Sequence, residues 1–146
     1  MSEPSTDPII VSARINAPIA AAWECYTQPQ HITQWNFADP SWHCPHAENA
    51  MEVGGRYLAR MEAKDGSFGF DFEAVYESIT PGRAFTYGFG GRTATVSFDE
   101  DGGVTTVTVS FTPEEINSRE RQQQGWQAIL DNYARYAEAV ITTTNS

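Results

Sequence analysis

The chain has 146 residues, a length that suits one domain and leaves little room for a second hydrophobic core. Hydrophobic residues make up 40% of the chain and charged residues 19%, a composition typical of a folded protein rather than a disordered one. The formal net charge of −10 argues against binding to nucleic acid or to an anionic membrane surface, because both partners select for a basic patch.

The first residues are acidic and polar, and no apolar run reaches the roughly 18–20 residues that cross a bilayer. We therefore expect a cytoplasmic protein, with a flexible N-terminal tail at 1–8, a single domain at 9–141 and a C-terminal tail at 142–146. Cys25 and Cys44 are too few for a disulfide scaffold and are expected to be free thiols.

The first third of the chain contains one predicted strand and two predicted helices. Alternating apolar and polar residues predict a strand over 9–15. Pro18 is well placed in the first turn of a helix over about 18–27, and a second short helix is expected over about 30–35. No periodic pattern follows over 36–52, which we interpret as a long loop.

The middle of the chain alternates like a series of hairpins, and the turn residues allow the register to be tested. With a two-residue turn at Asp65-Gly66, Met61 faces Phe70 on one side of the hairpin. On the other side Arg60 then faces Asp71, so apolar residues meet apolar residues and opposite charges meet each other. A slip of one residue would destroy this agreement.

Two further turns continue the same pattern. The Gly-Gly turn that follows pairs Tyr87 with Ala94, and a turn at 101–102 pairs Val96 with Val107. All three registers keep one continuous apolar face. Together the turns predict five antiparallel strands, at roughly 54–63, 67–79, 83–89, 92–99 and 104–112.

After Pro113 the spacing of apolar residues becomes helical and predicts a long one-sided helix over about 118–141. Asn117 with Glu120 fits the start of this helix as a capping box. Gly125 lies inside the helix, where glycine costs about 1 kcal/mol relative to alanine. A strand or a ligand that approaches the backbone closely would account for it.

The order of the elements, β-α-α-β-β-β-β-β-α, is that of the helix-grip fold. We therefore predict an α+β protein with a curved antiparallel six-stranded sheet wrapped around the long C-terminal helix, and two short helices between strands 1 and 2. A curved sheet that grips a helix tends to leave a cavity between the two.

Four segments carry a resemblance to a known family: WHCP at 42–45, VGGRY at 53–57, MEAKDGSFGFDFE at 61–73 and QGWQAILDNY at 124–133. They resemble the bacterial activator-of-Hsp90-ATPase-homologue-like (AHSA1-like) family. That family belongs to the START/Bet v 1-like (SRPBCC) superfamily of hydrophobic-ligand-binding domains, and the resemblance covers roughly residues 9–140. It implies the helix-grip fold, but no catalytic residue can be carried over, and an Hsp90-type chaperone as partner is not assumed.

We expect the domain to bind a small, largely apolar or amphipathic molecule between the sheet and the last helix, as a monomer or homodimer. The candidate ligand contacts are Tyr57, Phe70, Phe72, Tyr87, Trp126, Ile129, Tyr133 and His43. Aromatic residues also form a stripe along one predicted face of the sheet: Phe68, Phe70 and Phe72, with Met61, Phe85, Tyr87 and Phe98 on the same face. This aromatic stripe could form the apolar wall of a ligand cavity, or it could be plain core filling. The tyrosine hydroxyls could likewise bond backbone carbonyls or each other rather than a ligand.

The cluster His43-Cys44-Pro45-His46 contains residue types that bind zinc, but the usual paired ligand spacings are absent. No metal and no other cofactor is expected. We interpret the cluster as a loop at the mouth of the cavity, with His43 as a polar contact. A surface loop without a function is the alternative.

Two other classes of function remain open. A protein-interaction module of the co-chaperone kind would show an exposed apolar or charged patch and a closed interior. An enzyme of the cyclase or hydratase kind would use a pocket tyrosine or His43 as acid or base. The carboxylates Asp71 and Glu73 are disfavoured in that role, because they lie on the face opposite the phenylalanines.

Overall fold

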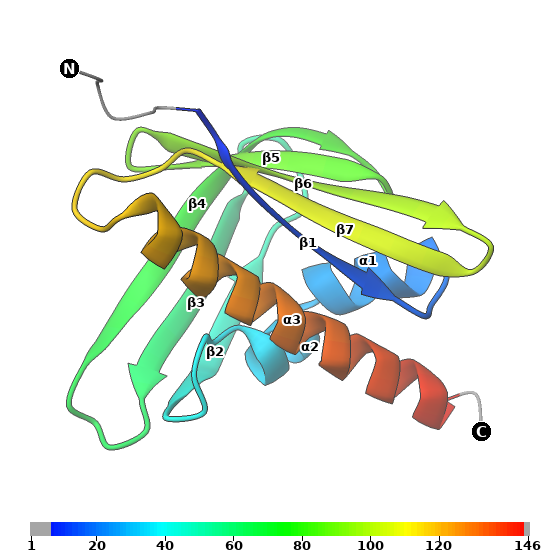
Figure 1. Ribbon diagram of the computed structural model, residues 1–146, viewed down its shortest axis with the longest axis horizontal. Helices are drawn as coiled ribbons and strands as arrows, with labels where there is room; N and C mark the ends of the chain where they lie inside the picture. The colour runs from blue at the N-terminus through cyan, green and yellow to red at the C-terminus, as the bar shows by residue number, and fades with distance from the viewer. Residues whose placement is uncertain (1–6, 145–146) are drawn as a thin grey trace.

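The computed structural model describes residues 7–144, with side chains as far as residue 140. One antiparallel sheet curls around a long C-terminal helix, and two short helices lie at one end (Figure 1). The elements in chain order are β1 (Ile9–Ile15), α1 (Ile19–Thr27), α2 (Pro29–Trp35), β2 (Trp42–Asn49), β3 (Arg56–Ala63), β4 (Gly69–Thr80), β5 (Ala84–Phe89), β6 (Arg92–Asp101), β7 (Val104–Phe111) and α3 (Arg119–Thr144). Most of the tail expected at 1–8 and the last two residues lie outside the described residues, whereas 142–144 belong to α3.

The sheet has seven strands in the order β1-β7-β6-β5-β4-β3-β2, so β1 and β2 form its two edges. The predicted register of the β3–β4 hairpin is confirmed, with Met61 opposite Phe70. The register of the β5–β6 hairpin is confirmed as well, with Tyr87 opposite Ala94. Antiparallel alternation therefore places the large inward-facing side chains of these four strands on the concave face.

The predicted register of the β6–β7 hairpin is wrong by two residues. Val96 faces Val109 rather than Val107, because the turn is made by Gly102 and Gly103. These glycines have φ of 60° and 84°, which a two-residue hairpin turn with positive φ at both positions requires. Side chains alternate between the two faces of a strand, so a shift of two residues leaves each of them on its predicted face. The predicted apolar face is therefore still correct.

The prediction of six strands is also wrong, because β2 lies within the segment expected to be a loop. This edge strand pairs with β3, and a bulge between His43 and His46 interrupts the pairing. The bulge accommodates Pro45, which cannot donate a ladder hydrogen bond. It also breaks the alternation of buried and exposed residues that reveals a strand in sequence.

The long helix α3 packs mainly against β1 and the two short helices. It begins one residue later than the predicted capping box implies, because Ser118 Oγ accepts a hydrogen bond of 3.1 Å from the Arg121 backbone N–H. Asn117 donates its side-chain amide to Glu114 instead. Among the described residues, no helix combines the length and the apolar character needed to span a bilayer.

Both cysteines are free thiols, as predicted, and both are buried. Removal from water raises the pKa of Cys25 to about 11, with Glu24 as a smaller cause. Burial raises the pKa of Cys44 to about 11 as well. The two thiols are therefore protonated and weakly nucleophilic at neutral pH.

Candidate functional site

The concave face of the sheet carries large side chains opposite small ones. Tyr57 faces Ala74 and Phe72 faces Ala59 across the β3–β4 hairpin. Tyr87 faces an alanine across the β5–β6 hairpin in the same way. Because alanines fill little volume, and because α3 rests mainly on β1 and the two short helices, space remains above the centre of the sheet.

That space is a cavity of about 300 Å³ between the sheet and α3. Its wall is mostly aromatic and aliphatic, with side chains from β3 to β7 and from all three helices. The size and the apolar lining are those of a site for one small molecule. Six of the eight residues predicted as ligand contacts line this cavity: Tyr57, Phe70, Phe72, Tyr87, Trp126 and Ile129.

Tyr133 does not line the cavity. Its ring is completely buried, and its hydroxyl donates a hydrogen bond of 2.6 Å to the carbonyl of Ala22. The bond ties α3 to α1, and burial raises the pKa of this phenol well above its ordinary value. Tyr76 has a comparable place in the core, where its hydroxyl donates to Asn49 Oδ1 at 2.6 Å.

His43 does not line the cavity either, so the predicted polar contact at the mouth is misplaced. It faces Glu62 across the β2–β3 ladder, with 3.6 Å between Nε2 and Glu62 Oε1. Glu62 in turn binds Arg60 on the face of the sheet that points away from α3. Within residues 7–144 no group of three or more His, Cys, Asp or Glu side chains is arranged to hold a metal ion.

The two carboxylates considered for acid–base chemistry lie on that same outer face, as the register predicts. Asp71 Oδ1 is 3.4 Å from Arg60 Nη1, and Glu73 Oε1 is 3.5 Å from Arg56 Nη1. All four side chains are at least one-third exposed. They are solvated ion pairs across neighbouring strands.

The closed end of the cavity contains tyrosine hydroxyls. Tyr57 and Tyr87 are almost completely buried, and Tyr26 from α1 joins them. Asn36, which follows α2, donates its side-chain amide to the Tyr57 hydroxyl at 3.0 Å. Burial is the main cause that raises the pKa of all three phenols well above the ordinary value, and neighbouring tyrosines, Tyr76 among them in each case, add to the effect.

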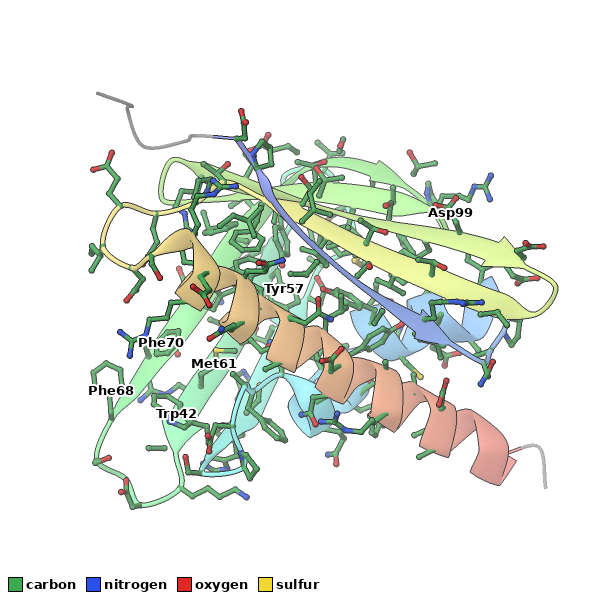
Figure 2. All side chains as sticks on the ribbon, viewed as in Figure 1. Trp42, Tyr57, Met61, Phe68, Phe70 and Asp99 are labelled. Carbon is green, nitrogen blue, oxygen red and sulfur yellow. The ribbon has the colours of Figure 1, made fainter. Side chains whose placement is uncertain are left out.

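The opposite end of the cavity reaches solvent beside the β3–β4 turn. Met61 is half-buried there, and Phe70 is 42% exposed. Figure 2 shows these two side chains close to the turn, with Phe68 and Trp42 beside them, whereas Tyr57 lies further from the turn. Trp42, Phe68 and Phe70, which we call the rim cluster, have ring centroids 5.9–6.3 Å apart.

Phe68 thus differs from its prediction as part of the apolar wall. It precedes β4, is 61% exposed and does not line the cavity. Phe85, expected on the same wall, is completely covered by core neighbours that include Trp23. The predicted aromatic stripe therefore divides into three environments, namely rim, cavity wall and core.

Stacked side chains from β5, β6, β7 and α3 form one side of the cavity. The Trp126 ring stacks on Phe111 with a centroid distance of 3.9 Å and an interplanar angle of 10°. The Arg92 guanidinium lies over the Phe89 ring, 4.9 Å from its centroid. Arg92 also donates its Nε–H to the Thr112 carbonyl, and among the described residues it is the one cation in the lining.

Eight further residues line the cavity and were not among the predicted ligand contacts. They are Tyr26, Trp35, Asn36, Met61, Phe89, Arg92, Val109 and Leu130. For several of them the sequence contains a pattern that predicts an inward-facing side chain. Phe89 and Val109 continue the inward alternation of their strands, and Tyr26 lies on the apolar face of its predicted helix. Asn36 and Arg92 have no such pattern, because a polar residue after a helix or beside a glycine turn is most often solvated.

With the fold and the cavity defined, comparison with known proteins identifies the family. The sequence profile described as "Activator of Hsp90 ATPase homolog 1-like protein" matches residues 16–138. The chain therefore belongs to this family, and the predicted resemblance is confirmed. No match was found among curated proteins.

Two solved structures are similar to this chain in sequence as well as in fold. The solution structure of the AHSA1-like protein from Aeromonas hydrophila is 36% identical, covers 90% of this chain and 93% of its own, and has a TM-score of 0.83. The solution structure of Chr148 from Cytophaga hutchinsonii is 40% identical, covers 92% and 94%, and has a TM-score of 0.78.

A third structure shows how far the fold extends beyond sequence similarity. Protein NE0264 from Nitrosomonas europaea is only 13% identical, yet it covers 96% of this chain and 99% of its own with a TM-score of 0.80. This similarity shows the architecture alone, because one fold serves many functions.

Proposed function

We propose that this protein binds a small, largely apolar molecule in the cavity between the sheet and α3. The observation that carries the proposal is a cavity of about 300 Å³ whose wall is mostly aromatic and aliphatic. Transfer of an apolar molecule from water into such a space is favourable, and a few polar groups are enough to orient it.

The exposed rim cluster favours a second candidate, a protein-interaction module. Phe68 is 61% exposed and Phe70 42% exposed, so two large apolar rings face solvent side by side. That hypothesis also predicts a closed interior, which the cavity contradicts. Phe70 belongs to both features, so the rim cluster is equally well explained as the entrance of the cavity.

An enzymatic function has less support. Over residues 7–140, no imidazole and no carboxylate is among the side chains that line the cavity, so this lining lacks the usual kinds of general base. The phenols are held neutral by burial and serve as hydrogen-bond donors.

The proposal is tested by filling the cavity. Ile129 lies on α3, is half-buried and lines the cavity, so the Ile129→Trp variant adds an indole ring where a ligand would lie. We expect the affinity for the fluorescent probe 1-anilinonaphthalene-8-sulfonate to fall by about tenfold or more, which corresponds to about 1.4 kcal/mol. Small molecules extracted from the purified wild-type protein and identified by mass spectrometry should likewise be depleted in this variant.

The matched control is Gln123→Trp, which places the same side chain on an exposed position of the same helix. It should bind the probe as the wild type does. Unchanged binding in Ile129→Trp, with loss of binding in Phe68→Ala, would locate the probe on the rim cluster and refute the cavity as the binding site.

A further inference from the structure

The hydroxyls at the closed end of the cavity have protons to donate. Within residues 7–144, the Tyr26 and Tyr87 hydroxyls make no hydrogen bond to another protein group. Tyr57 accepts the 3.0 Å bond from the Asn36 amide, and its own proton has no acceptor in the same part of the chain. Three donors from three different elements therefore lack a protein acceptor.

The hydroxyls of Tyr26 and Tyr87 are not sealed in the core. Every side-chain nitrogen or oxygen that is fully enclosed within the described part of the chain has a hydrogen-bond partner. Tyr26 and Tyr87 have no partner, so their hydroxyls must reach accessible space, and the cavity is the space that both residues line. The ring centroids of Tyr57 and Tyr87 are 5.6 Å apart, so the two phenols are neighbours on the wall of this cavity.

The three phenols are protonated at neutral pH. Burial raises the pKa of each phenol well above its ordinary value of 10.0. A neutral phenol donates one hydrogen bond, and an unpaired buried donor is unfavourable. The closed end of the cavity thus presents three hydroxyl donors that a ligand with a hydrogen-bond acceptor could satisfy.

We propose that the closed end of the cavity recognises a carbonyl oxygen of an otherwise apolar ligand through the hydroxyls of Tyr57, Tyr87 and Tyr26. This inference rests on the proposed binding function and specifies the chemical class of the ligand. A carbonyl oxygen has two lone pairs and no proton, so it can accept two of these bonds at once. An alcohol would bring a further donor to a place that already has too many.

A carboxylate suits the closed end less well than a neutral carbonyl. Burial of an anion is costly unless a cation is close to it, and the three phenols carry no charge. Arg92 is the one cation that the described part of the chain contributes to the lining, and it lies over Phe89 beside the β5–β6 turn. If Arg92 rather than the tyrosines selected the ligand, an acid would bind more tightly than a ketone.

Three probes that share a naphthalene ring and differ in one small substituent separate these cases: 2-acetylnaphthalene, 2-ethylnaphthalene and 2-naphthoate. Their dissociation constants for the full-length protein are measured by calorimetry. We expect the ketone to bind at least about fivefold more tightly than the hydrocarbon, because it gains a hydrogen bond to the phenols. We expect the carboxylate to bind more weakly than the ketone.

The variant Tyr87→Phe removes one donor and keeps the ring. It should weaken binding of 2-acetylnaphthalene by about fivefold and leave binding of 2-ethylnaphthalene unchanged, so the hydrocarbon reports on an intact cavity. Tyr26→Phe should act in the same way. The matched control is Tyr136→Phe, whose hydroxyl bonds His31 Nδ1 outside the cavity, and it should change neither affinity.

The outcomes distinguish this inference from the proposed function. Equal affinities for ketone and hydrocarbon, or tighter binding of the carboxylate, would overturn the carbonyl assignment and leave an apolar binding cavity in place. Failure of all three probes to bind, together with an unchanged extract in the Ile129→Trp variant, would overturn both.

Discussion

Thr105 illustrates how a single buried hydrogen bond contributes to this fold. It lies on β7 with no exposed surface, and its hydroxyl donates to the Ala17 carbonyl at 2.7 Å. The bond fixes the connection between β1 and α1 against the sheet. Loss of the donor would leave a buried carbonyl without this partner.

We predict that Thr105→Val lowers the free energy of unfolding by about 1–3 kcal/mol, since the replacement keeps the shape and removes the hydroxyl. Urea denaturation followed by circular dichroism measures the change. Thr106→Val is the control, because Thr106 is half-buried on the same strand and is expected to change stability by less than about 0.5 kcal/mol. Equal effects of the two substitutions would contradict the assigned role.

At Gly125 we predict that a substitution stabilises the protein, in contrast to the substitution at Thr105. Apart from the adjacent residues and the backbone of α3 itself, no atom of the described residues lies within 4 Å of the position that a Cβ would take, so no strand approaches the helix backbone there. We therefore expect Gly125→Ala to stabilise the protein by up to about 1 kcal/mol, seen as a higher melting temperature. A lower melting temperature would show that the glycine has a role in the backbone that the structure does not explain.

Among the helices, α3 depends on a defined start. The four N–H groups at a helix N-terminus have no partner within the helix, and Ser118 supplies one acceptor. We predict that Ser118→Ala costs about 1 kcal/mol of unfolding free energy, measured by urea denaturation. Ser118→Asp supplies a carboxylate oxygen as the acceptor in place of the hydroxyl and should retain most of the stability. A loss in both variants would rule out capping as the cause.

Among the strands, β4 is bent where it crosses the sheet. Its pairing with β5 shifts between Tyr76 and Ser78, and the extra residue is Glu77. A bulge of this kind increases the local twist and bend of a strand. The curvature directs the concave face of β3 to β5 around α3, and so it contributes to the space that the cavity occupies.

For the protein as a single cooperative unit, the two buried thiols predict a loss of stability at alkaline pH. In the unfolded chain they release their protons near the ordinary pKa of 9.0, whereas in the folded chain both pKa values are about 11. The unfolded state therefore holds fewer protons than the folded state between these values, and the free energy of unfolding falls as pH rises from about 9.

Urea denaturation at a series of pH values tests this prediction. The matched protein is the Cys25→Ala, Cys44→Ala double variant, which should show a smaller decline between about pH 8.5 and 9.5. Buried tyrosines add their own decline above about pH 10 in both proteins, so the comparison is made below that value. An identical pH dependence would refute the contribution of the thiols.

Much of the fold could be predicted because its elements are encoded by short-range patterns. Alternation along β3 and β4 fixed their register, and the helical spacing after Pro113 indicated α3. The strand β2 could not be predicted in the same way. Its bulge around Pro45 breaks the alternation, and an edge strand needs no uniform apolar face.

The sequence predicted which face of the sheet carries the candidate site, but it did not predict which of the inward-facing side chains line the cavity. The spacing of Tyr87 and of Tyr133 predicts an inward-facing side chain in both cases. Tyr87 lines the cavity, whereas the Tyr133 hydroxyl donates a hydrogen bond to the Ala22 carbonyl. His43 follows a helix and a polar stretch, and only the β2–β3 pairing turns it away from the cavity.

Side-chain spacing along the chain thus decided which faces are apolar and where the strands and helices lie, because that periodicity follows from the local backbone geometry of each element. The placement of α3 across the sheet decided that a cavity remains and which phenols face it. These outcomes depend on contacts between segments far apart in the sequence, and no local pattern records those contacts.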